Sequence, residues 1–486
     1  MSQGISRREF VGAAAGMAAL ARANRAVAAD GANYALPKFT KARVLRIFIG
    51  QRAGWPKPDL DIEAEIKHLR AGIDAAPGVQ DIEFIEDRHV TDADTLTQLI
   101  ARHKGADGIL VVPVSMGTSQ LYAMLADTGV PTISLATPYS GHEWCIVPDL
   151  MKAGKKIDVI TSSNINDVAE AFRQFRAIHR LKETKVLYVG GGYPAPEKYV
   201  TAVKQKFGTT IVPFDHKRLV EVYEAMDAAA VEADAEQWIK NAQKIVEPSR
   251  EEISKSARLS LAMQKVLADE RAHAITINCL GLFGARAMPA YPCLGFARLN
   301  DLGLAGVCEA DLLSTMTQLI YLHLTGKPGF VTDPVIDTSN NTVIHAHCVA
   351  ATKMDGPAGE SAPYVIRSHL EDYKGAVLQT RMRIGQEITM AKLVGVDPDV
   401  PQKPQLAASP FESYGVDTLL VSTGQIIDVP DSDRGCRTQI TTRVRDARRM
   451  LEQWSHGLHR VVFYGNHLAD TRRLARFLDI NVVEEC

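Results

Sequence analysis

The sequence predicts an α/β protein in which two doubly wound domains are followed by a C-terminal domain of antiparallel strands that resembles a β-barrel. Two patterns lead to this prediction. Over residues 43–345, short apolar runs alternate with helical stretches, as in βαβ units that build parallel sheets. After about residue 350, strands of alternating polarity follow one another between turn glycines, as in antiparallel sheets and small barrels. The length of 486 residues agrees, because it exceeds what one hydrophobic core holds.

Residues 1–28 have the pattern of a twin-arginine (Tat) export signal, which predicts a periplasmic protein cleaved after Ala28. Arg7 and Arg8 stand before a weakly apolar run, and the small residues 26–28 have the spacing that a signal peptidase reads. The apolar run spans about eleven residues, far fewer than the roughly 20 that cross a bilayer. No later run is apolar and long enough to span a membrane. An ordinary amphipathic N-terminal helix is the alternative interpretation.

A first Rossmann-like domain is expected over residues 43–150. Its apolar runs predict parallel strands, and the amphipathic stretches between them predict the helices that cover the sheet. The expected strands are 43–50, 81–85, 108–114 and 130–136, and the expected helices are 62–75, 92–103 and 118–128.

A second Rossmann-like domain is expected over residues 151–345. The turn Gly190-Gly191-Gly192 could hold a phosphate, but neither a P-loop lysine–serine pair nor a full dinucleotide-binding motif follows it, so a tight turn is favoured. The expected strands are 158–161, 185–189 and 274–278, and the expected helices are 166–180, 198–206, 219–232 and 251–270.

Residues 346–486 are expected to form the barrel-like domain. Its strands are predicted from alternating polarity between turn glycines. They are expected at 364–369, 376–383, 387–394, 418–422, 425–429 and 439–444. In the last part of the chain helices and strands are expected to alternate, as helix 446–454, strand 460–464, helix 469–478 and strand 480–483.

The composition is that of an ordinary globular protein and argues against some partners. Hydrophobic residues make up 46% of the chain, charged residues make up 23%, and the net charge is -2. Because there is no basic excess and no long run of like charges, we expect neither a nucleic-acid partner nor a membrane-surface partner. Seven cysteines without a CxxC pair favour free thiols over a disulfide framework or zinc ligation.

Acidic residues and histidines gather on short elements in the middle of the chain. Glu309 and Asp311 open an expected helix that runs to about residue 325, and Asp333 lies at an expected strand end before a proline. His345 and His347 stand two apart on an expected strand, so they point to the same face. Carboxylates and imidazoles bind divalent metals and also move protons. Each residue also has a structural interpretation: a helix cap for the first two acids, a turn for the third, and a core position for either histidine.

Several short motifs in this region carry a resemblance to a known family. They are Leu299-Asn300-Asp301-x-Gly303, Cys308-Glu309-x-Asp311, Leu324-Thr325-Gly326-Lys327-Pro328, Asp333, Asn341 and Ala346-His347-Cys348. They are similar to motifs of the L-fucose isomerase and L-arabinose isomerase superfamily. The resemblance is thin over the first domain and best over residues 291–350 and 455–484. It implies that Glu309 and Asp333, 24 residues apart (309 to 333), bind manganese (Mn²⁺), whereas Asp311 is left as a helix cap.

The resemblance also implies histidine ligands. His347 matches the position of a metal-binding histidine of the arabinose enzymes, although its distance in sequence from Asp333 is a few residues shorter here. For a further ligand near the C-terminus, His456, His459 and His467 are candidates. In the family this ligand is followed by a strand, a glycine and a helix. Aligning these features without a gap to the same features of this sequence places His459 at the ligand position, ahead of the other two.

The implied activity is the metal-dependent isomerisation of an aldose to a ketose through an enediolate, with Glu309 and Asp333 as catalytic residues and a small sugar as substrate. Leu458 stands where the fucose enzymes have asparagine, which leaves the identity of the sugar open. The resemblance also implies a homo-oligomer, a hexamer or a trimer, with the active site between subunits. An epimerase or lyase acting on an oxidised sugar would need the same residues. An exported, non-catalytic carbohydrate-binding protein is a further alternative.

Overall fold

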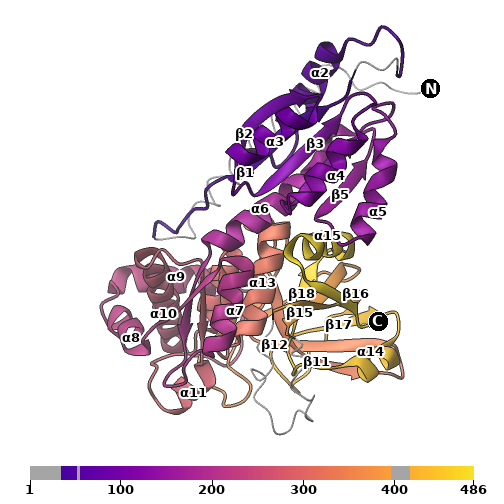
Figure 1. Cartoon of the computed structure of the whole chain (residues 1–486). Helices are drawn as coiled ribbons and strands as arrows, with labels where there is room; N and C mark the ends of the chain where they lie inside the picture. Colours follow the sequence, from indigo (N-terminus) through magenta and orange to yellow (C-terminus); the bar gives the residue numbers. More distant parts are fainter. Residues whose placement is uncertain (1–33, 52–54, 396–415) are drawn as a thin grey trace, which may run out of the picture.

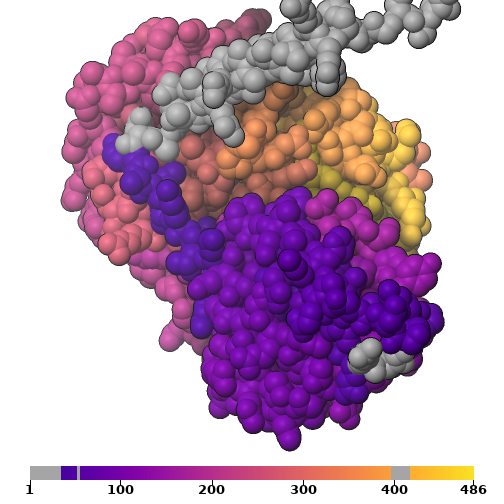
Figure 2. Space-filling model, turned by 90° about the horizontal axis from the view of Figure 1, so that it is seen from above, coloured from indigo at the N-terminus to yellow at the C-terminus, as the bar shows by residue number. Residues whose placement is uncertain are grey.

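The computed structural model describes residues 34–51, 55–395 and 416–486, which form a mixed α/β protein of three parts (Figure 1). The second part and the barrel lie side by side, and the N-terminal part lies at one end of both (Figures 1 and 2). The predicted export signal, residues 1–28, lies outside the described residues. In the described ranges, no helix is both long and apolar enough to cross a bilayer.

The N-terminal sheet has five parallel strands in the order β2-β1-β3-β4-β5. All residues of its central strand β3 are buried, because apolar side chains pack on both faces of the sheet. The strands are β1 (Ala42–Ile49), β2 (Ile82–Val90), β3 (Gly108–Pro113), β4 (Thr132–Ala136) and β5 (Ile157–Thr161), and the helices between them are α2 (Ile62–Ala75), α3 (Ala93–Arg102), α4 (Ser119–Asp127) and α5 (Val147–Lys152).

Strand β5 belongs to this first sheet, although the sequence pattern places it at the start of a second domain. It pairs in parallel with β4, from Ile157 opposite Thr132 to Thr161 opposite Ala136. The first sheet therefore continues to residue 161 instead of ending near residue 150. A short apolar strand has the same pattern whichever sheet it joins, so its pairing cannot be read from its own residues.

The second sheet has four parallel strands in the order β10-β9-β6-β7. Helix α13 is buried along residues 312–324, because it packs both on helix α6 and on the barrel, between which Figure 1 shows it. The strands are β6 (Lys185–Val189), β7 (Thr210–Pro213), β9 (Ala274–Ile277) and β10 (Ala305–Cys308). The helices are α6 (Ala169–Glu183), α7 (Glu197–Phe207), α8 (His216–Glu224), α9 (Ala228–Asn241), α10 (Arg250–Asp269), α11 (Cys279–Gly284), α12 (Cys293–Asp301) and α13 (Leu312–Thr325).

Six antiparallel strands close into a barrel, in the order β15-β18-β11-β12-β17-β16, with β16 pairing back to β15. This confirms the predicted α/β chain with an antiparallel, barrel-like C-terminal part. The strands are β11 (Phe330–Asp337), β12 (Thr342–His347), β15 (Glu387–Val394), β16 (Thr418–Asp428), β17 (Thr438–Val444) and β18 (Arg460–Tyr464). Strand β19 (Asn481–Glu484) adds in parallel to β16, and the helices α14 (Ala447–Gln453) and α15 (Leu468–Leu478) flank β18 in the chain.

The barrel begins at β11, earlier than the expected boundary at residue 345. Strands β11 and β12 form an antiparallel hairpin in which Val335 lies opposite Ile344, and both strands pair onward to other barrel strands. Two of the expected barrel strands instead join a small separate sheet in the order β14-β13-β8. Its strands are β8 (Lys244–Ile245), β13 (Tyr364–Arg367) and β14 (Val377–Thr380).

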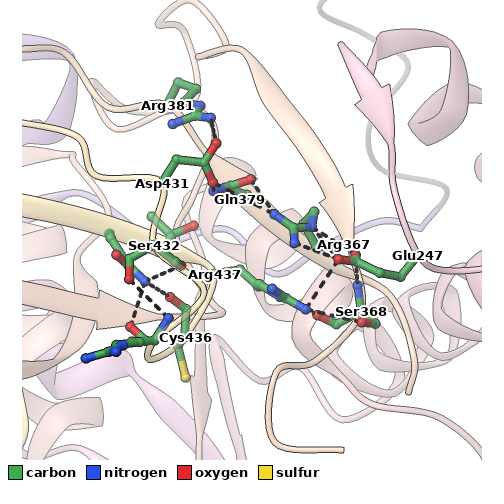
Figure 3. A network of polar contacts seen from close by, with 12 residues as sticks. Glu247, Arg367, Ser368, Gln379, Arg381, Asp431, Ser432, Cys436 and Arg437 are labelled. Atoms are coloured by element: carbon green, nitrogen blue, oxygen red, sulfur yellow. Dashed lines mark hydrogen bonds and ion pairs between the residues drawn. The ribbon is translucent and has the colours of Figure 1, made fainter. Parts of the chain in front are cut away.

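A network of charged side chains joins this small sheet to the segment before β17 (Figure 3). Arg367 donates to Glu247 over 2.9 Å, and Arg437 lies 3.5 Å from the same carboxylate. Asp431 lies 3.9 Å from Arg367 and so adds a second negative charge. Because Thr438, at the start of β17, pairs with His347, this network supports the strand opposite a predicted site residue.

Candidate metal centre

A tight turn after strand β10 positions Glu309. Its φ of 61° and the φ of 52° at Ala310 lie in the left-handed region, which costs a residue other than glycine about 1–2 kcal/mol. The turn is held by a hydrogen bond from the Ala310 N–H to the carbonyl of Ile277 on the neighbouring strand. The sequence pattern predicts that Glu309 opens helix α13. In the structure Glu309 precedes this helix, and its side chain is turned toward the barrel.

The structure brings together three of the residues that the sequence predicts as metal ligands. His459 Nε2 lies 3.2 Å from Asp333 Oδ1 and 3.5 Å from Glu309 Oε2. Glu309 follows β10 of the second sheet, Asp333 lies on β11, and His459 ends the loop before β18. The centre is thus assembled where the second sheet meets the barrel.

Asp311 holds the other side of the His459 ring. As predicted, it caps helix α13, because its Oδ1 accepts a hydrogen bond from the Ser314 N–H over 3.0 Å. Its Oδ2 also accepts a hydrogen bond from His459 Nδ1 over 2.8 Å. This second contact fixes the ring so that Nε2 faces Glu309 and Asp333.

The charges at this point favour a cation. Burial by itself lowers the pKa of His459, but the hydrogen bonds to Asp311 and Asp333 and the charge of Glu309 outweigh burial and raise the pKa to about 10. One positively charged ring therefore faces three carboxylates at neutral pH. Net negative charge in a largely buried place is stabilised by further positive charge.

Glu309 and Asp333 remain ionised. Burial raises the pKa of each, but the hydrogen bond of His347 and the charge of His459 in the case of Glu309, and the hydrogen bond of His459 in the case of Asp333, produce a net lowering. Both side chains are 34% exposed, whereas His459 is 12% exposed. A small molecule can therefore reach the two carboxylates while the imidazole stays fixed behind them.

His347 contacts the other carboxylate oxygen of Glu309, and its ring lies beside that of His459. Its Nε2 is 3.6 Å from Glu309 Oε1 and 3.4 Å from Cys308 Sγ, and its Nδ1 accepts a hydrogen bond from the Cys348 N–H. Donor atoms of Asp333, His347 and His459 lie within 4.8 Å of one another, as do those of Cys308, Glu309 and His347. In this ring orientation the proton of a neutral His347 is on Nε2, so a metal at Nε2 would require the bond from Cys348 to break.

The other histidines considered from the sequence lie outside these groups. His345 is a core histidine inside the barrel, bonded to Thr332 and Thr442, and burial lowers its pKa to about 3. His456 bonds to the neighbouring serine, and His467 lies at the start of helix α15 with its Nε2 2.9 Å from the carbonyl of Tyr464. Of the three late histidines, His459 lies beside Glu309 and Asp333, and its role as a metal ligand stays a prediction.

Sequence reasoning misses two contacts and one residue beside the centre. The contact of Asp311 with His459 and that of Cys308 with His347 have no signal in the sequence, because their partners lie far along the chain. Lys392 has one, because it is a single lysine in an apolar strand and, two residues after the core residue Met390, points to the same inward face. It is buried, and burial lowers its pKa to about 8 against the opposing charge of Asp311.

No protein-family model matches the chain. Among curated proteins, it is similar to a sulfoquinovose isomerase from Clostridium sp. (strain MSTE9), with 25% identity over 315 residues. The similarity covers 63% of this chain and 64% of that protein, so the match spans less than two thirds of the relative's length.

Proposed function

We propose that the protein is a metal-dependent aldose–ketose isomerase that acts on a small sugar through an enediolate intermediate. The observation that carries the proposal is the meeting of Glu309, Asp333 and His459 Nε2 at one partly exposed point. The similarity to a sulfoquinovose isomerase supports it, because that relative is named for the isomerisation of a sugar.

The residues fit a divalent metal ion. Two carboxylates and an imidazole nitrogen are donors that manganese and similar ions accept. The hydrogen bond from His459 Nδ1 to Asp311 is the carboxylate–histidine pairing that orients metal-binding histidines and increases their basicity. We propose Glu309, Asp333 and His459 as ligands of Mn²⁺ or another divalent ion, which would bind His459 Nε2 in place of the proton that the metal-free ring carries there. His347 would be a further ligand once its ring has turned away from the Cys348 N–H.

A bound divalent ion supplies Lewis-acid polarisation of the carbonyl and the adjacent hydroxyl of the sugar. Glu309 and Asp333 supply the proton transfers. One carboxylate removes the proton from C2 of the aldose and returns it to C1, while the other moves the hydroxyl proton from O2 to O1. Asp311 keeps the imidazole of His459 in place, so the two acids keep their positions relative to the substrate during these transfers.

An aldose screen tests the proposal. The protein is stripped of metal with a chelator, reloaded with Mn²⁺, and incubated with a panel of aldoses in which sulfoquinovose is the first member. We expect a ketose, detected by NMR, only from the reloaded protein. Ketose formation by fully stripped protein would contradict the metal requirement. An epimer or an elimination product would instead favour the epimerase or lyase alternative, and sugar binding without turnover would favour a carbohydrate-binding protein.

We further propose that the protein is exported folded by the Tat pathway to the periplasm and assembles as a homo-oligomer, a hexamer or a trimer. Manganese binds weakly in the Irving–Williams series, so loading before export would avoid competition from zinc and copper. N-terminal sequencing of periplasmic protein should begin after Ala28, and native mass measurement should give three or six subunits. Full-length protein in the cytoplasm, or a monomer, would contradict these two proposals.

A further inference from the structure

We propose that Arg460 is a positioning residue that holds the loop carrying His459, and that Glu485 provides the buried negative charge which Arg460 requires. The inference rests on the proposed metal centre, because its effect is the orientation of a metal ligand. Arg460 and Glu485 themselves contact neither the proposed metal position nor the substrate.

The loop from Trp454 to His459 has neither helix nor strand of its own. It connects helix α14 to strand β18, and two of its residues, His456 and Gly457, have φ angles of 62° and 84°. Backbone carbonyls in such a segment have no ladder partners, yet buried carbonyls must be paired. Side-chain donors can pair the carbonyls that turn inward.

Arg460 supplies them. Its Nη1 donates to the carbonyls of Gly457 (3.3 Å) and His459 (3.1 Å), and its Nη2 donates to the carbonyl of Ser455 (3.0 Å). The guanidinium group also lies over the ring of Trp454, 3.8 Å from its centroid. One side chain thus contacts the whole length of the loop that ends at the proposed ligand.

Glu485 occupies the remaining donors. Arg460 Nε lies 3.2 Å from Glu485 Oε2, and Arg460 Nη2 lies 2.7 Å from Glu485 Oε1. With these bonds all five N–H groups of the guanidinium have acceptors. Both side chains are 0% exposed, so neither charge is screened by water. Glu485 is itself fixed, because its N–H donates to the carbonyl of Val421 on strand β16.

His459 is consequently anchored at two places. Its carbonyl accepts from Arg460, which fixes the backbone, and its Nδ1 bonds to Asp311, which fixes the ring. A lysine at position 460 keeps the charge but lacks the planar fork that reaches several acceptors at once. The variant Arg460→Lys should therefore loosen the loop without introducing a new charge.

The test compares Mn²⁺ affinity, measured by calorimetry on the full chain, in wild type, Arg460→Lys and Glu485→Gln. We expect both variants to bind Mn²⁺ more weakly by on the order of 10–100-fold, the usual effect of losing an outer partner of a metal ligand. The matched control is Arg298→Lys, because Arg298 also pairs with a buried carboxylate, Asp234, and also lies over a tryptophan, Trp238. It should lower thermal stability while leaving Mn²⁺ affinity unchanged.

A merely structural role for Arg460 would change the melting temperature of both variants and leave their Mn²⁺ affinity within twofold of wild type. That result would overturn the inference alone. Circular dichroism at the binding temperature identifies a variant that fails to fold, and the remaining variant then decides. If neither folds, Trp454→Leu, which removes only the stacking surface, takes their place with the same expected direction. Wild-type protein that binds no divalent ion would overturn the proposed function and this inference together.

Discussion

His459 Nδ1 lies 2.8 Å from Asp311 Oδ2, although the two residues are 148 positions apart in the chain. Asp311 starts a helix of the second part, and His459 ends a loop of the barrel. The contact therefore does two things: it joins two parts of the molecule, and it directs Nε2 of the imidazole at Glu309 and Asp333.

Replacing Asp311 by asparagine separates its capping of helix α13 from its charged contact with His459. Asparagine caps helices about as well as aspartate, so helix α13 should still start at the same residue. The negative charge beside His459 is lost, and we expect Mn²⁺ affinity to fall on the order of 10-fold. Calorimetric titration measures the change. Asp92→Asn is the control, because Asp92 caps helix α3 in the same way and is far from the centre in the fold; equal affinity in wild type and Asp311→Asn would contradict the role assigned to this contact.

The two histidines should differ in their importance for the metal. His459 faces both acids with Nε2, whereas Nδ1 of His347 is engaged by a backbone N–H. We therefore expect His459→Gln to weaken Mn²⁺ binding at least on the order of 100-fold, and His347→Gln to weaken it less. Electron paramagnetic resonance of free Mn²⁺ compares the two variants. A larger loss in His347→Gln would show that the ring turns and that His347 is the principal nitrogen ligand.

Asp107 should contribute stability that depends on pH. Burial raises its pKa, but hydrogen bonds from His179, Lys182 and the N–H of Arg43 outweigh burial, so the pKa in the folded protein lies below its ordinary value of 3.8. The folded state thus binds this proton more weakly than the unfolded state, and the contribution is present above the ordinary value and lost as the pH falls through the folded one. Asp107→Asn should lower the free energy of unfolding at neutral pH by about 1–3 kcal/mol.

Urea unfolding at a series of pH values checks this prediction. The free energies of wild type and Asp107→Asn should approach each other as the pH is lowered, because acid removes from the wild type what the substitution removes from the variant. A constant difference at all pH values would mean that the hydrogen bonds of Asp107 do not depend on its charge.

The family resemblance carried by the short motifs indicated which acids and which late histidine come together, as Glu309, Asp333 and His459 do. It did not indicate the contact between Asp311 and His459, because a capping aspartate has the same local pattern whether or not a distant histidine reaches it. Arg460 was missed for a similar reason, because its partners are set by how the barrel closes. Lys392 could have been found from its place as a single lysine in an apolar strand.

The parts of the fold were predictable where periodicity identifies an element, and less so where pairing decides. The run 158–161 was recognisable as a strand, but its edge position beside β4 depends on residues 132–136. Strands β13 and β14 have the same alternation as barrel strands, yet they pair with each other, and β13 pairs with β8 from the second part. Pairing partners far apart in sequence leave no mark on either strand alone.

The most direct measurement of the central claim is the turnover of Glu309→Gln in the presence of Mn²⁺. The substitution keeps the size of the side chain and removes its negative charge at the point that faces His459 and His347. For an aldose that the wild type converts, we predict a rate at least about 10²-fold lower, with an unchanged circular dichroism spectrum. Wild-type rates of ketose formation by Glu309→Gln would contradict the assignment of this carboxylate and the isomerase mechanism built on it.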